Sequence, residues 1–123
     1  MAAKRIPGDI GRAAVRGALA VDASRDTRAT AVRYLLQTLA SAAEGNTVEV
    51  RVPPFGAVQA IQGPRHTRGT PPNVVETDAA TWLALATGSL SWVEAVASGR
   101  VAASGQRADL GDYLPIAWET IEE

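Results

Sequence analysis

The sequence has no cysteine and only one histidine, His66, among its 123 residues. The absence of cysteine excludes disulfide bonds, thiolate metal sites and cysteine nucleophiles. A single histidine, with no second ligand at metal-binding spacing, predicts no metal site and no catalytic base with its orienting partner. The G-x-S-x-G nucleophile motif and the glycine-rich phosphate-binding motifs are absent as well. We therefore expect no catalytic residues, no cofactor and no enzymatic activity.

A strong charge of one sign and a long apolar run are also missing. The formal net charge is −1, which provides no long-range attraction to nucleic acid. No apolar run approaches the roughly 18 residues that a membrane span needs, so no integral membrane segment is expected. The first residues carry two positive charges but no apolar stretch after them, which does not fit a secretory signal. These features predict a cytoplasmic protein.

Aromatic residues make up only 5% of the chain, although 46% of it is hydrophobic and much of that fraction is alanine. Small side chains fill space poorly, so a cavity for a ligand is compatible with this composition. Tight packing between helices is equally compatible with it. The length predicts a single domain over residues 1–123, with residues 1–8 and 116–123 flexible at its ends.

The first half of the chain contains one strong helical pattern. Within residues 27–44 the apolar positions recur at helical spacing and share one face, and they are Val32, Leu35, Leu36, Leu39 and Ala43. A weaker, alanine-rich pattern predicts a short helix over residues 9–21. Regular alternation predicts a half-buried strand over residues 47–52, which forms a hairpin with residues 55–61 around two prolines.

The second half alternates short strands and short helices. A strand over residues 73–77 leads to Asp78, which is predicted to cap a helix that Gly88 ends. Ser91 opens a second helix that ends at Gly99. One more strand follows, over residues 100–104. Because helices and strands do not alternate regularly along the whole chain, the fold class is α+β.

This second half resembles the sterol carrier protein superfamily. The resemblance depends on an acidic residue after a strand, two short helices that end at glycine, and a small strand that ends at glycine: Asp78, Trp82, Leu85, Gly88, Ala95, Gly99, Val101 and Gly105. It covers residues 27–115 and is strongest to small stand-alone actinobacterial members. It implies a mainly antiparallel, twisted sheet of about five strands, covered by helices on one face.

The resemblance also implies a non-catalytic domain that binds a lipid or another apolar small molecule between sheet and helices. The side chains expected to line this cavity are Leu35, Leu39, Val50, Phe55, Val58, Trp82, Leu85, Val93 and Val96. The same positions fit an ordinary filled core, which gives the same sequence pattern.

A loop between the predicted strands gathers three potential hydrogen-bond donors, Arg65, His66 and Arg68. Arginine holds carboxylate and phosphate groups through paired hydrogen bonds, so these residues are candidates for an anion-binding rim beside the cavity. The alternative is a rigid hairpin connection whose arginines pair with acidic residues nearby.

A second hypothesis belongs to another functional class. If the core is filled, the domain acts as a protein-interaction or oligomerisation module, through a sheet edge or an apolar helix face. A homodimer or a protein partner is then expected in place of a lipid.

Overall fold

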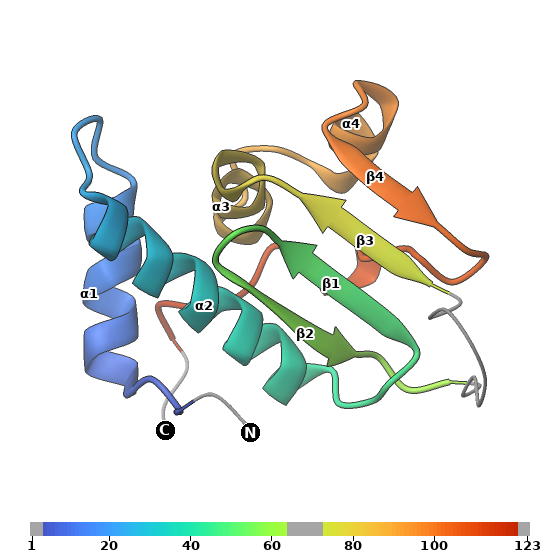
Figure 1. The fold of residues 1–123 in the computed structure, drawn as a ribbon, viewed down its shortest axis with the longest axis horizontal. Coiled ribbons are helices and arrows are strands. Elements are labelled where there is room, and N and C mark those ends of the chain that lie inside the picture. The colour runs from blue at the N-terminus through green and yellow to red at the C-terminus, as the bar shows by residue number, and fades with distance from the viewer. Residues whose placement is uncertain (1–3, 64–72, 121–123) are drawn as a thin grey trace.

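The computed structural model describes residues 4–63 and 73–120, and shows an α+β fold, as the sequence predicts. In chain order the helices and strands are α1 (Gly8–Ala18), α2 (Arg25–Ala42), β1 (Val48–Val52), β2 (Gly56–Ala60), β3 (Val74–Thr77), α3 (Ala79–Thr87), α4 (Trp92–Ala97), β4 (Val101–Ser104) and a short 3-10 turn, η1 (Gly111–Tyr113). Figure 1 shows α2 running beside the sheet, with α1 on the side of α2 away from the strands.

The sheet has the strand order β2-β1-β3-β4. β1 pairs antiparallel with β2 and parallel with β3, while β3 pairs antiparallel with β4. In the described residues the sheet therefore has four strands instead of the expected five or so, and one of its three pairings is parallel. After β4 the described chain forms the short turn η1 and no further strand.

Capping side chains set where the helices begin. Ser24 accepts a hydrogen bond from the Thr27 amide at 3.1 Å, and Asp78 accepts one from the Thr81 amide at 2.7 Å. At α4, the Ser91 hydroxyl accepts from the Glu94 amide at 3.1 Å and donates to the Glu94 carboxylate at 3.0 Å. These bonds satisfy amide groups that have no partner within the first helical turn.

The central helix α2 is buried on two sides. Its predicted apolar face packs toward the sheet and α3, and Val32 and Leu35 are fully buried. Tyr34 is also fully buried, although it lies outside the predicted stripe. The ring of Tyr34 occupies the space that a Cβ atom at Gly11 of α1 would need. The absence of a side chain at Gly11 thus lets α1 approach α2 closely and cover its second side.

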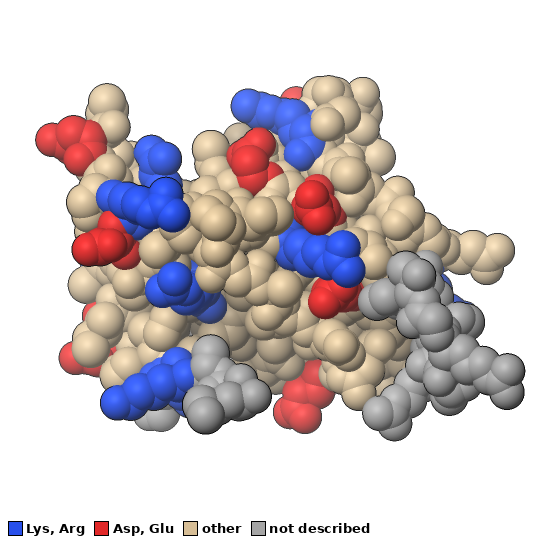
Figure 2. All heavy atoms as spheres, viewed as in Figure 1, with Lys and Arg blue, Asp and Glu red and all other residues tan. Residues whose placement is uncertain are grey.

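The face of the sheet away from the core is polar. Glu49 and Arg51 alternate with buried valines along β1, and Arg51 pairs with Glu49 at 2.6 Å. Glu76 on the neighbouring strand lies 4.0 Å from the same guanidinium. Figure 2 shows this arrangement as a basic group between two acidic groups over the sheet. Such exposed pairs contribute little to stability, about 0–1 kcal/mol.

The C-terminal segment returns to the domain. The Ile116 amide donates to the Ala86 carbonyl at 2.8 Å. Trp118 is buried, with the Arg16 guanidinium 5.9 Å from its ring centre. These contacts join part of the segment 116–123, expected from the sequence to be flexible, to α1 and α3.

Candidate functional site

Five of the nine side chains expected to line a cavity lie in the packed core. Each has at most 1% of its surface exposed, and they are Leu35, Leu39, Val50, Trp82 and Leu85. The Trp82 indole also donates a hydrogen bond to the Val32 carbonyl at 3.3 Å. These residues belong to one buried cluster between the sheet and the helices, and their role as the lining of a ligand cavity stays a prediction.

The other four side chains lie elsewhere. Phe55 and Val58 are partly buried and line a groove outside the core. Val93 and Val96 point outward from α4 and are 75% and 43% exposed. The three residues of the predicted anion rim, Arg65, His66 and Arg68, lie outside the described residues, so this rim stays a prediction.

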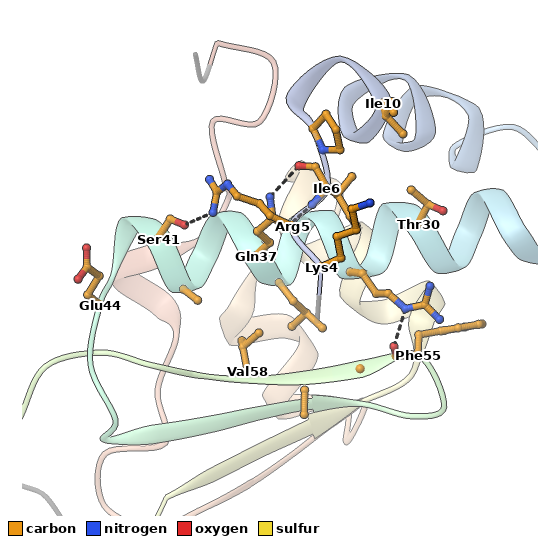
Figure 3. A pocket seen from close by; sticks show the side chains of 16 residues that line it. Lys4, Arg5, Ile6, Ile10, Thr30, Gln37, Ser41, Glu44, Phe55 and Val58 are labelled. Carbon is orange, nitrogen blue, oxygen red and sulfur yellow. Dashed lines mark hydrogen bonds between the residues drawn. The ribbon is translucent and has the colours of Figure 1, made fainter. Parts of the chain in front are cut away.

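The groove that contains Phe55 and Val58 runs along α2, and we call it the α2–β2 groove (Figure 3). Its volume is about 1000 Å³, the upper end of the roughly 300–1,000 Å³ typical of small-molecule sites. The groove is bounded by the segment before α1, the outer side of α2 and the edge strand β2. Its lining residues are Lys4, Arg5, Ile6, Pro7, Ile10, Thr30, Arg33, Leu36, Gln37, Ala40, Ser41, Glu44, Phe55, Gly56, Ala57 and Val58.

The groove is open because several of the residues that line it on α2 and β2 have small side chains. Ala40 and Ser41 on α2, with Gly56 and Ala57 on β2, place no large side chain in it. A Cβ atom at Gly56 would lie 3.5 Å from Leu36 Cδ1, which is ordinary van der Waals contact. The space is therefore set by side-chain size and does not require an unusual backbone.

The outer wall of the groove is residues 4–7, which we call the N-terminal strap. Gln37 holds this strap with both ends of its amide: its Nε2 donates to the Ile6 carbonyl at 3.0 Å, and its Oε1 accepts from the Ile6 amide at 2.8 Å. Arg5 adds a longer contact with the Ser41 hydroxyl, at 3.5 Å. The side chain of Gln37 thus replaces the backbone partner that a neighbouring strand would offer to Ile6.

Two arginines hold the hairpin end of the groove. The Arg33 Nε donates to the Phe55 carbonyl at 3.0 Å. The Arg25 guanidinium lies over the Phe55 ring, 5.1 Å from its centre, within the range of a cation–π interaction. Because both arginines belong to α2, these contacts join the hairpin to the helix.

A smaller hollow lies beside α4, with a volume of about 380 Å³. Trp92, which is half-buried, lines it together with Leu90, Leu114 and Pro115. It shares no lining residue with the α2–β2 groove, and two of the residues predicted to line a cavity, Leu85 and Val93, line this hollow.

Neither a metal centre nor a membrane span emerges from the described chain. Residues 4–63 and 73–120 contain no group of three or more histidine, cysteine, aspartate or glutamate side chains placed to hold a metal ion. Within the same ranges, no helix is both long and apolar enough to cross a bilayer.

Comparison with protein families gives a match to the model described as bacterial SCP ortholog, over residues 24–116. The chain belongs to this family of sterol carrier protein-like domains. The match covers about three quarters of the sequence and agrees with the span 27–115 over which the sequence resembles sterol carrier proteins. A comparison with curated proteins gave no match.

The family match divides the groove between two parts of the chain. The walls from α2 and β2 lie within the matched residues of the sterol carrier protein-like domain. The N-terminal strap and Ile10 lie before residue 24, outside the match. The outer wall of the groove therefore comes from residues outside the matched span.

The sequence analysis selected large apolar residues as candidates for the binding site and did not identify the small residues that line the groove. Ala40 and Gly56 carry no chemistry that marks a site, and the strap belongs to a segment expected to be flexible. A signal for the strap exists in Gln37, a polar residue on α2 whose amide binds backbone, but nothing in the spacing identifies Ile6 as its partner.

Proposed function

We propose that this domain is a non-catalytic carrier that binds a lipid or another apolar small molecule in the α2–β2 groove. The observation that supports it is the groove itself, a large open space lined by Leu36, Phe55 and Val58 beside a core that is already packed. Membership of a sterol carrier protein-like family supports the same class of function.

The dimensions of the groove suit one apolar chain. Its lining on α2 extends from Thr30 to Glu44, about 21 Å at 1.5 Å per residue. One leaflet of a bilayer core is about 15 Å thick, so a chain that spans a leaflet fits this length. Each methylene group that leaves water contributes about 0.8 kcal/mol to binding.

The proposal is tested by filling the groove. Ala40 is half-buried and lines the groove, whereas Ala42 is exposed on the same helix and does not. We expect Ala40→Phe to weaken the binding of dodecanol at least about tenfold, or about 1.4 kcal/mol, and Ala42→Phe to leave it unchanged. Isothermal titration calorimetry with dodecanol below its solubility limit measures both.

Three results of this titration have different meanings. If Ala40→Phe loses dodecanol binding and Ala42→Phe keeps it, the result supports the groove as the binding site. Binding that neither substitution alters, but that a larger side chain at Leu85 abolishes, places the ligand between sheet and helices, as the sequence predicts. No binding of dodecanol to the unmodified protein, together with native mass spectra that show no lipid adduct after purification, refutes the carrier function.

The interaction-module hypothesis has its own support. Val93 and Val96 expose apolar surface on α4, and Tyr113 is 39% exposed. An interaction module predicts a stable dimer, or a co-purifying protein, that Val93→Glu disrupts. Sedimentation velocity over a range of concentrations measures this, and a monomer at all concentrations that binds no partner contradicts it.

A further inference from the structure

One end of the α2–β2 groove is basic. Lys4 and Arg33 line it there, and Arg25 lies two helical turns before Arg33 against the same Phe55. In the described part of the chain, no carboxylate forms an ion pair with any of these three side chains. Their charges therefore add to a positive potential at this end of the groove.

Arg33 is already positioned to receive an anion. Its Nε is occupied by the Phe55 carbonyl, which fixes the plane of the guanidinium. Its two terminal nitrogens have no hydrogen-bond partner among the described residues. A planar fork of donors matches the oxygens of a carboxylate or a phosphate, and prior fixation reduces the entropy lost when the anion binds.

The opposite end of the groove differs in charge. Glu44 lies there, and Arg5 reaches the Ser41 hydroxyl about one helical turn before it, so an acidic and a basic side chain stand near each other at that end (Figure 3). Between the ends the lining includes Leu36, Ala40 and Val58, and the amide of Gln37 there is bonded to the backbone of the strap. A negative headgroup is thus favoured at the end with Arg33, where no described carboxylate pairs with the guanidinium, and an apolar chain follows the space between the two ends.

We propose that the groove selects an amphiphile with a single apolar chain and one anionic headgroup, a carboxylate or a phosphate monoester, held by Arg33 and Lys4. This inference rests on the proposed carrier function and adds to it the ligand class, the orientation of the ligand and the residues that determine specificity. The strap contributes Lys4, so the selectivity depends on residues outside the family match.

The test compares ligands that share one chain and differ in headgroup. Calorimetric titrations use dodecanoate, dodecyl phosphate and dodecanol below their critical micelle concentrations, with acetate and inorganic phosphate as headgroups without a chain. We expect the two anionic amphiphiles to bind about tenfold more tightly than dodecanol, as charge-assisted hydrogen bonds predict. We expect no measurable binding of acetate or phosphate alone.

Substitutions then assign the preference to Arg33. Arg33→Gln is expected to weaken dodecanoate binding about tenfold more than it weakens dodecanol binding, so that the preference for the anionic headgroup is lost. Arg28→Gln is the matched control, because Arg28 is exposed on the same helix and does not line the groove. Thermal unfolding by circular dichroism verifies that both variants fold.

Each contrary result has one meaning. Equal affinity for dodecanoate and dodecanol in the unmodified protein, or an Arg33→Gln variant that keeps the preference, overturns the anionic ligand class and leaves the carrier function standing. Inorganic phosphate that binds as tightly as dodecyl phosphate also overturns it, in favour of a site for free anions. If no chain compound binds, the carrier function and this inference fail together.

Discussion

The two sides of α2 differ in what faces them, although they belong to one continuous helix. On the side toward the sheet and α3, Leu35 and Leu39 belong to one buried cluster with Trp82 and Leu85, and each has at most 1% of its surface exposed. On the side toward the strap, Ala40, Ser41 and Gly56 are among the residues that line a groove of about 1000 Å³. Side-chain size at a few positions therefore separates a core that stabilises the fold from a surface that can receive a ligand.

We call the side of α2 toward the sheet and α3 the closed side, and the side with the groove the open side. The largest expected loss of stability is on the closed side. Trp82→Ala removes the largest fully buried side chain and its hydrogen bond to the Val32 carbonyl. We expect the free energy of unfolding to fall by about 3–5 kcal/mol. On the open side, Val58→Ala should cost about 1 kcal/mol. Urea denaturation of both variants measures the contrast, and equal losses would show that the two sides do not differ.

The next largest loss of stability is expected at the contact between α1 and α2. A Cβ atom at Gly11 would overlap the ring of Tyr34, which is fully buried. Gly11→Ala should therefore destabilise the fold by about 1–3 kcal/mol, despite the better helix propensity of alanine. Gly17→Ala is the control, since its Cβ atom would meet only a Thr27 methyl group at 3.1 Å. A Gly11→Ala variant as stable as the parent in thermal unfolding would contradict the close packing of α1 on α2.

An intermediate loss of stability is expected when the hydrogen bonds that hold the strap are removed. Gln37→Ala removes both hydrogen bonds to Ile6, and we expect a loss of about 1–2 kcal/mol. The Ile6 amide should then exchange with solvent faster, while amides of β1 keep their protection. Hydrogen exchange followed by NMR measures both. Unchanged protection of the Ile6 amide would show that Gln37 does not hold the strap.

The smallest effect is expected at Gly56. There is room for a methyl group beside Leu36 Cδ1, and glycine weakens a strand relative to alanine. Gly56→Ala should raise the free energy of unfolding by about 0.5 kcal/mol. The same methyl group narrows the groove, so dodecanol should bind more weakly to this variant. Tighter binding of dodecanol would contradict the placement of its chain beside β2.

The closed side of α2 could be predicted from the sequence, because burial there follows local periodicity. The spacing of Val32, Leu35 and Leu39 is a helical stripe, and Asp78 and Ser91 cap the helices that they were expected to cap. The four strands lie within a residue or so of their predicted bounds. The parallel pairing of β1 with β3 was not predicted, since strand order depends on contacts between distant segments.

The open side could not be predicted, for a physical reason. The groove exists because residues 4–7 lie against α2, a contact between segments about 30 residues apart in sequence. Its lining includes Ala40 and Gly56, whose effect is the space that they leave empty. The periodicity of a sequence indicates which side chains are buried on a helix or strand. It does not indicate where two neighbouring elements leave a space between them.

The position of a bound chain tests the central claim most directly. Isotope-filtered NOE spectra of labelled protein with unlabelled dodecanoate record which methyl groups contact the ligand. If the open side of α2 is the binding side, the chain gives NOEs to Ala40, Leu36 and Val58. NOEs to Val50 and Leu85, with none to Ala40 or Val58, would place the ligand in the core and contradict the account.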